Sequence, residues 1–239
     1  MGPVGSETYF CLQRSLTNVS SNLPLIVLEN YGSGRPPQGD YQTASMAVIE
    51  PAEGRSRLTS PFAASSQVGI KIRGSSTSGR SKASLSLEVQ DEFGQDRNLS
   101  LLGMPNESDW VLWGPYNFDL TLMHNPFIFE LSRQIGRYAP RTRFVELYLN
   151  TGGGALSSSD YYGVYALMEK ISRDADRVDV ERLFGEHKQE PDVSGGYIFK
   201  IDRADPGDSG FSGASQSIKY VYPKEVEIEQ PERDAQQQY

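Results

Sequence analysis

The sequence VGIKIRGSSTSGRSKASLSLEVQ (residues 68–90) alternates apolar and polar side chains on both sides of a stretch rich in glycine and serine. Alternation with a period of two is typical of half-buried strands, so we expect strands over residues 68–73 and 82–90. The residues between them, 74–81, are of the types that favour a turn. This stretch therefore predicts a β-hairpin, with the leucine and valine side chains of its second strand on the buried face.

Further strands and one helix are predicted around this hairpin. Short apolar or alternating runs that end at Gly, Pro or Asn indicate strands over residues 23–29, 44–49, 110–113, 144–149, 163–171 and 196–202. A helix is expected to begin with Asn125 as its N-cap and Pro126 at its first position, and to end at Gly136. The side chains expected on its buried face recur at helical spacing: Phe127, Ile128, Leu131 and Ile135.

Many antiparallel strands with one inserted helix predict an α+β fold rather than a doubly wound α/β fold. Residues 1–22 are polar, and we expect them to form an irregular segment. Residues 23–239 are then expected to form one domain.

Composition excludes several classes of function. A net charge of −8 makes the chain a poor candidate for nucleic-acid binding. Positive residues are concentrated at 71–82, 133–143 and 170–177, which suits a small anionic ligand such as a nucleotide better than a polymer. One cysteine and two histidines leave no internal disulfide and nearly exclude a Cys/His zinc site. No apolar run approaches the length of a membrane span.

The turn of the predicted hairpin is a candidate phosphate-binding segment. Its backbone N–H groups and hydroxyls can face phosphate oxygens. Lys82, on the polar face of the following strand, can point into a cleft and reach the same phosphates. The alternatives are an ordinary hairpin turn and a solvated lysine. The turn residues that we single out are Arg73, Gly74, Ser75 and Ser76.

Glu130 is the candidate partner of Lys82. It lies three residues after Phe127, at the edge of the helix face expected to be buried. An acid there can reach a lysine on the sheet against which the helix packs, and the alternative is a boundary glutamate in water. Loop, lysine and acid are three of the four parts that phosphoryl transfer needs, and carboxylates for Mg²⁺ are the fourth.

Candidates for the remaining parts follow predicted strands. The backbone of Glu169 and Lys170 can hydrogen-bond an adenine, with Met168 packing on the adenine ring. The alternative is that a core strand simply ends here and a charged loop follows. Asp202 or Asp179 can be a Mg²⁺ ligand, and the alternative is a turn cap.

Taken together, the sequence motifs of this chain resemble those of the CotH protein kinases, a family known from bacterial spore coats. The resemblance runs from about residue 23 to the end of the chain, and the LGMP…SDW and APRTRFVEL stretches make it specific. The matching stretches are KIRGSSTS (71–78), LLGMPNESDWVL (101–112), LTLMHNPFIFELSRQIG (120–136), YAPRTRFVELYLN (138–150), YYGVYALMEKISRDADRVDV (161–180), GGYIFKID (195–202) and YVYPKE (220–225).

The resemblance implies a distant protein-kinase-like fold. It also implies an enzyme that transfers the ATP γ-phosphate, with Mg²⁺ or Mn²⁺, to Ser or Thr of spore-coat or other extracellular proteins. On this basis residues 73–76 would cover the phosphates, Lys82 would contact them and Glu130 would hold Lys82. Residues 168–170 would lie near the nucleotide base.

Two departures from the family pattern affect what we expect of the kinase site. The family usually has Arg-Asn where this chain has His124-Asn125, and a mostly neutral histidine would weaken any electrostatic role. The Asp- and Asn-rich motifs that follow in the family find no match here, so we expect the N-terminal, nucleotide-binding portion of the kinase domain. Two alternatives stay open: a non-catalytic module for surface or coat assembly or adhesion, and a carbohydrate-binding module presenting Trp110, Trp113 and Tyr116.

Overall fold

The computed structural model describes residues 9–74, 76–114, 116, 119–184, 187, 189–202, 208–213, 215–224 and 227. The chain divides into two compact units, residues 1–170 and 171–239. The regular secondary structure of the described residues consists mainly of strands, with a single α-helix. The expectation of mainly antiparallel strands with one inserted helix is therefore confirmed for them.

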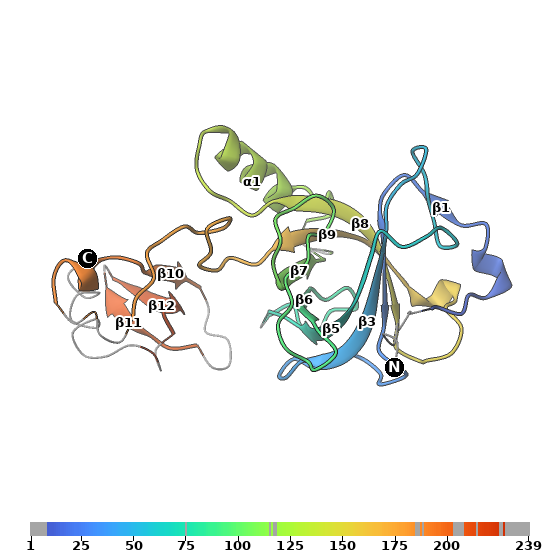
Figure 1. Ribbon diagram of the computed structural model, residues 1–239, viewed down its shortest axis with the longest axis horizontal. Helices are drawn as coiled ribbons and strands as arrows, with labels where there is room; N and C mark the ends of the chain where they lie inside the picture. The colour runs from blue at the N-terminus through green and yellow to red at the C-terminus, as the bar shows by residue number, and fades with distance from the viewer. Residues whose placement is uncertain are drawn as a thin grey trace, which may run out of the picture. The chain divides into compact units, whose positions relative to one another are not determined.

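The first unit is a closed β-barrel (Figure 1). Its strands follow one another around the barrel in the order β2–β3–β5–β6–β7–β9–β8. All neighbours are antiparallel except β2 and β8, which pair in parallel and close the barrel. The strands are β2 (Leu25–Glu29), β3 (Gln42–Ile49), β5 (Ala64–Ile72), β6 (Leu85–Gln90), β7 (Asp109–Trp113), β8 (Thr142–Asn150) and β9 (Tyr161–Glu169).

Short elements lie outside the barrel wall. In the first unit they are η1 (Arg14–Leu16), β1 (Ser20–Ser21), β4 (Ser56–Arg57) and η2 (Ser158–Asp160). Leu16 of η1 is buried in a second apolar cluster with Leu25 and Val27 of β2, so part of the N-terminal segment packs on the barrel.

The predicted hairpin is confirmed as β5 and β6. Ile70 pairs with Leu87 and Ile72 with Leu85, and all four side chains point into the barrel core. The second strand begins at Leu85, three residues later than predicted. The carbonyl of Ala83 accepts a hydrogen bond from the Tyr165 hydroxyl at 3.1 Å, so a side chain from β9 binds the segment just before the strand. Lys82 therefore lies in the turn before β6.

Both tryptophans come from β7, and neither forms an exposed platform. Trp110 is fully buried in the barrel, and its Nε1 donates to the carbonyl of Glu107 at 3.0 Å. Trp113 is partly buried on the outer side of the wall, beside Val111 and Phe129. Packing therefore uses both tryptophan rings, which argues against the alternative of a carbohydrate-binding module on these aromatics. The third ring of that alternative, Tyr116, is 47% exposed.

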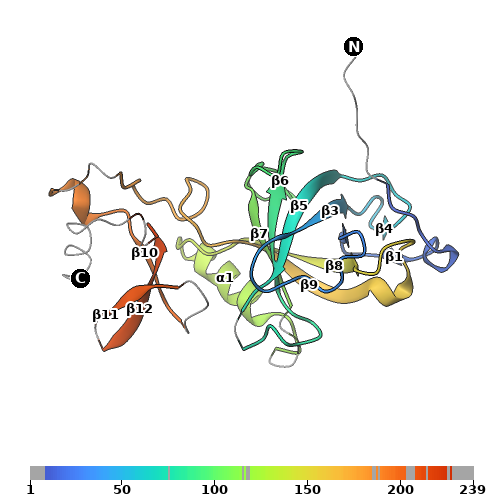
Figure 2. The ribbon, with the colours of Figure 1, turned by 90° about the horizontal axis from the view of Figure 1, so that it is seen from below.

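Helix α1 (His124–Gln134) lies against the outer side of β7, β8 and β9 (Figure 2). It packs through Phe129, which contacts a buried cluster formed by Val111, Ala166 and Met168. The face expected to be buried is instead exposed, with exposed fractions of 63% for Phe127 and 71% for Ile135. The prediction was wrong because α1 packs on the apolar outer wall through a different face, the one that contains Phe129.

The two ends of α1 differ in how well the sequence predicted them. At the C-terminal end Gly136 has φ +79°, and its N–H donates to the Arg133 carbonyl at 2.9 Å, as a glycine helix stop requires. At the N-terminal end the helix begins at His124, one residue before the predicted N-cap. The buried carboxylate of Asp119 accepts the His124 N–H at 2.9 Å, so Asp119 takes the capping role assigned to Asn125.

The second unit contains η3 (Asp192–Ser194), β10 (Ile198–Ile201), β11 (Gly210–Gly213) and β12 (Gln216–Tyr222). The three strands form an antiparallel sheet with β12 in the centre, and Phe199, Phe211 and Tyr220 pack on one another across it. The strand predicted over residues 196–202 is confirmed as the shorter β10. No helix in the described residues is long and apolar enough to cross a membrane.

Candidate functional site

Two loops meet at the end of the barrel where β5 stops and β6 starts. The side chain of Arg35, in the loop between β2 and β3, donates to the carbonyls of Ser78 at 2.7 Å and Arg80 at 3.0 Å. Gln38 from the same loop donates to the Gly74 carbonyl at 2.9 Å. Arg35 was not singled out from the sequence, because a contact between loops about 40 residues apart leaves no local signal.

The turn predicted to face phosphate begins with a glycine in the left-handed backbone region. Gly74 has φ +88°, and a Cβ at this position would lie 2.7 Å from the Thr77 Oγ1. A side chain here would be strained by the backbone conformation and would have to displace the Thr77 hydroxyl. Arg73 precedes it, and its N–H donates to the Ser84 carbonyl at 3.0 Å. Ser76 is exposed in the turn, and Ser75 lies outside the described residues.

Lys82 projects from this turn across the mouth of the barrel. Its Nζ lies 5.0 Å from the centre of the Tyr165 ring, and Tyr165 is a fully buried member of the barrel core. Gly114 makes room for the lysine side chain, because a Cβ there would lie only 3.2 Å from the Lys82 Cγ. A Cβ on Gly163 would lie 3.6 Å from the Lys82 Nζ, which is an ordinary contact.

The environment of Lys82 disfavours its positive charge. Burial lowers the pKa of the Lys82 ammonium below its ordinary value. Its described contact is with the Tyr165 ring, and no carboxylate of the described residues forms an ion pair with it. Arg35 and Arg80 belong to the two loops beside it, so this end of the barrel carries further cations. Such an arrangement suits an anion. The charge of Arg73 acts instead on Tyr41, whose ring Lys71 also covers.

Glu130 does not contact Lys82. Its carboxylate pairs with Arg133 and accepts a hydrogen bond from Gln134 at 3.0 Å, and both partners lie on α1 itself. These bonds, the Gln134 contact first, lower the pKa of the Glu130 carboxyl. Lys82 points to the interior ring of Tyr165, whereas α1 covers the outer wall, so the two side chains lie on opposite sides of the sheet. The predicted ion pair is therefore wrong.

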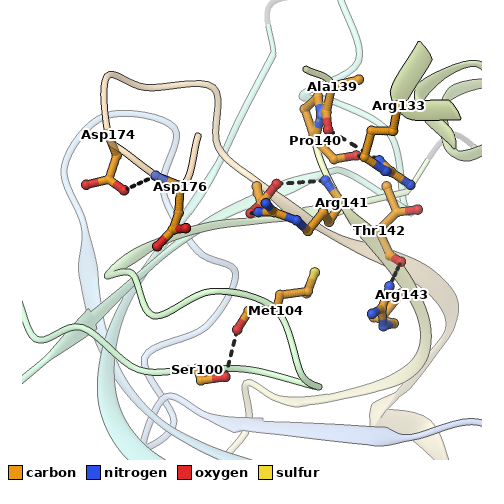
Figure 3. Close-up of polar contacts among 11 residues, drawn as sticks. Ser100, Met104, Arg133, Ala139, Pro140, Arg141, Thr142, Arg143, Asp174 and Asp176 are labelled. Atoms are coloured by element: carbon orange, nitrogen blue, oxygen red, sulfur yellow. Dashed lines mark hydrogen bonds and ion pairs between the residues drawn. The ribbon is translucent and has the colours of Figure 1, made fainter. Parts of the chain in front are cut away.

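Arg133, the ion-pair partner of Glu130, explains why the Glu130 side chain lies along the helix. Its guanidinium also donates to the carbonyls of Ala139, at 3.3 Å, and Pro140, at 2.5 Å (Figure 3). Arg133 thereby ties the end of α1 to the segment that enters β8. Glu130 is the acidic neighbour of this structural arginine.

Met168, Glu169 and Lys170 lie at the other end of β9, about 20 Å along the strand from Gly163. Met168 is buried beneath α1. Glu169 is 1% exposed, accepts the Arg141 N–H at 2.8 Å and pairs with the Arg141 guanidinium at 2.5 Å. These contacts give the segment a structural role, and the nucleotide-base role stays a prediction.

Lys170, in turn, pairs with Asp109 at 2.8 Å, which fastens the end of β9 to the start of β7. Both glutamate and lysine at this strand end therefore have protein partners. Neither side chain needs a ligand to balance its charge.

The metal assignment stays open for Asp202 and Asp179. Asp202 directly follows β10, and both residues belong to the second unit. Among the described residues, no three His, Cys, Asp or Glu side chains are grouped as metal ligands. His124 has an exposed side chain whose Nδ1 lies 3.6 Å from the Asp119 Oδ2. Its part in capping α1 is made by its backbone N–H, which donates to Asp119.

Comparison with known proteins agrees with the sequence motifs. Residues 70–239 match the family model described as CotH kinase protein, and this is well over half of the chain. The chain therefore belongs to the CotH kinase family. No curated protein matches it.

Proposed function

We propose that this protein binds ATP at the Lys82 end of the barrel and acts as an atypical Ser/Thr protein kinase of the CotH type. Its acceptors would be Ser or Thr hydroxyls of spore-coat or other extracellular proteins. The proposal includes a distant likeness of the fold to protein kinases. Family membership supports the class, and the environment of Lys82 supports the location of the site.

The observation that carries the proposal is the partly buried ammonium of Lys82. A charge held partly out of water is costly unless an opposite charge lies beside it. No described carboxylate supplies that charge, and a triphosphate would. Binding of an anion would also return the pKa of Lys82 towards its ordinary value.

The surrounding residues fit the phosphate part of a nucleotide. The turn after β5 offers hydroxyls and backbone groups, and Arg35 and Gln38 hold it in place from the neighbouring loop. Arg80, in the same turn, adds positive charge, and Arg73 takes part through its backbone. Mg²⁺ or Mn²⁺ would enter with the nucleotide through phosphate oxygens, which is the usual way Mg²⁺ is bound at such sites. The proposal does not depend on a protein ligand for this metal ion.

The reaction would transfer the γ-phosphoryl group to an acceptor hydroxyl. The bond between the γ-phosphorus and the bridging oxygen breaks, a bond to the acceptor oxygen forms, and ADP and a proton leave. Lys82 would neutralise charge on the phosphate oxygens during this transfer. Glu130 has no part in this scheme, because it lies on the other side of the wall.

The test is a phosphotransfer assay with the full chain, γ-labelled ATP, Mn²⁺ or Mg²⁺ and a Ser/Thr-rich acceptor. Lys82→Met should lower transfer at least about a hundredfold, since it removes the charge on the phosphates. Lys71→Met is the matched control, because the Lys71 Nζ lies 4.3 Å from the Tyr41 ring centre on the outer wall. Equal labelling by both variants would contradict the proposal, as would a complete lack of transfer by the folded wild-type chain.

A non-catalytic role in surface or coat assembly is the second candidate. One observation favours it: Phe127, Ile128, Leu131 and Ile135 of α1 stay exposed in the described structure. Exposed apolar groups of this extent are typical of interaction sites. If this role holds, binding to a coat or cell surface should survive Lys82→Ala and Glu130→Ala and be lost with Ile128→Asp. Loss of binding with Lys82→Ala would count against it.

A further inference from the structure

A second candidate binding site lies on the outer side of the barrel, away from Lys82. A pocket of about 440 Å³ lies over β3 and β5, between the loop that follows β2 and the turn that follows β6. This volume is in the range of small-molecule sites. Lys82 instead points across the barrel mouth to the interior ring of Tyr165. The two sites are therefore on different faces of the wall.

The floor of this pocket is a row of polar side chains on three neighbouring strands. Ser45 pairs with Gln67, and Gln67 pairs with Gln90. Their neighbours Val68 and Val89 point into the barrel core. Because side chains alternate along a strand, the polar row must face outwards. The floor is thus fixed by the same register that builds the core.

The floor keeps hydrogen-bonding capacity for a ligand. No other group in the described part of the chain hydrogen-bonds to the partly buried Gln67 amide, which offers two donors and one acceptor. Ser65 adds an exposed hydroxyl. The Gln90 amide nitrogen donates to Glu88 at 2.9 Å, which orients that side chain and leaves its oxygen available.

Two exposed aromatic rings flank the floor. Tyr31 is 63% exposed and Phe93 is 78% exposed, and both line the pocket. Tyr31 comes from the loop after β2, and its hydroxyl is hydrogen-bonded to the Ser45 hydroxyl. Phe93 sits in a turn held by Asp91, whose carboxylate accepts the Phe93 N–H at 2.8 Å. Both rings therefore project from anchored backbone.

Tyr31 also has an unusual backbone conformation. Its φ is +59°, which is rare for a bulky residue, and the Glu29 carboxylate accepts its N–H at 2.7 Å. Such conformations persist where the surroundings enforce them and often mark functional positions. Here the conformation brings the ring over the outer face of β3.

We infer that this pocket binds a neutral saccharide chain. Aromatic rings pack on the apolar faces of sugar rings, while amides and hydroxyls pair with sugar hydroxyls. Among the lining residues Asp91 and Glu92 outnumber the single cation Arg97, which disfavours an anionic sugar. A peptide adding itself as a strand is disfavoured as well, because the closed barrel has no free edge at β3, β5 or β6.

The inference can be tested with the full chain and three neutral hexasaccharides: cellohexaose, maltohexaose and chitohexaose. The chitohexaose is used in its fully N-acetylated form, because the free amines of the unacetylated sugar would be charged. We expect saturation transfer from protein to at least one of the three sugars. Phe93→Ala and Gln67→Ala should each weaken its binding about tenfold, as expected for central contact residues. Phe127→Ala removes another exposed phenyl ring, from α1, and should change the affinity by less than about twofold.

Two results would overturn the inference. One is absence of binding to all three sugars at about 10 mM, a concentration that reveals even very weak complexes. The other is binding that Phe93→Ala and Gln67→Ala leave unchanged. Both residues are surface-accessible, and circular dichroism of each variant verifies that the barrel is folded. The result is independent of ATP binding, because the Lys82 side chain is intact in every variant.

Discussion

Lys82 and Tyr165 meet at the mouth of the barrel, where the lysine ammonium lies 5.0 Å from the centre of the tyrosine ring. Tyr165 also donates its hydroxyl to the carbonyl of Ala83, next to Lys82 in the chain. The same ring thus positions both the backbone and the side chain of the candidate phosphate site. The packing around this pair determines how the site responds to mutation.

Gly114→Ala should disturb this pair. The added Cβ would lie 2.6 Å from the Tyr165 Cε1 and 3.2 Å from the Lys82 Cγ. Because the ring is fully buried and cannot move freely, we expect the free energy of unfolding to fall by about 1–3 kcal/mol. Tryptophan fluorescence during urea unfolding reports this unit, since both tryptophans are in β7.

Gly39→Ala is the control for that substitution. A Cβ at Gly39 meets no atom within 4 Å, so this variant should unfold like the wild-type chain. Equal unfolding midpoints for the two alanine variants would show that the glycine at position 114 is not needed for packing.

Glu130→Gln should leave ATP affinity unchanged. The carboxylate is bound to Arg133 and Gln134 on α1, on the opposite side of the wall from Lys82. Lys82→Met should weaken ATP binding at least about tenfold, as expected for a charge on the phosphates. Isothermal titration calorimetry with the two variants separates these effects. Comparable losses of ATP affinity in both variants would support an ion pair between Lys82 and Glu130 and contradict this structure.

Phe129 and Phe127 should differ sharply in their contribution to stability. Phe129 packs on the outer-wall cluster, so Phe129→Ala should cost about 2–4 kcal/mol. Phe127 is 63% exposed, and Phe127→Ala should change stability by less than about 0.5 kcal/mol. Urea unfolding of the two variants measures the difference. The reverse order would mean that α1 packs through the face predicted from its periodicity.

Asp119 should make the stability of the barrel unit sensitive to acid. Burial raises the pKa of this carboxyl, but hydrogen bonds from the Thr121 hydroxyl and the His124 N–H outweigh burial and lower the pKa. A carboxyl with a lowered folded-state pKa stabilises above its unfolded value of about 3.9, and that stabilisation is lost as pH falls through the folded value. Asp119→Asn should therefore destabilise the protein at pH 6 and differ less from wild type at pH 2. A difference that stays constant over this range would contradict the assignment.

Local patterns predicted the strands because alternation records which side of a wall each residue faces. The β5–β6 hairpin and the C-terminal end of α1 at Gly136 followed from such local rules. Closure of the barrel did not, because the parallel pairing of β2 with β8 joins residues such as Leu25 and Glu146 that are far apart in the sequence. The sequence of β2 carries no sign of which strand will be its second neighbour.

The candidate site was predicted only in part for a similar reason. The turn at Gly74 and the lysine at position 82 were found from composition and position. The expected partner Glu130 was wrong, because periodicity marks an apolar face of α1 without showing which stripe the wall will cover. Arg35 and Tyr165 were missed, since their roles arise from contacts between distant loops and strands.

The most direct test of the central claim is the reactivity of Lys82 towards an acetylating reagent, measured residue by residue with mass spectrometry in the presence and absence of ATP. The lowered pKa of Lys82 makes more neutral amine available at mildly alkaline pH, so the free protein should be labelled there. ATP should slow labelling of Lys82 about tenfold or more and leave Lys71 and Lys170 unaffected. Unchanged labelling of Lys82 at saturating ATP would contradict the claim that this lysine binds the phosphates.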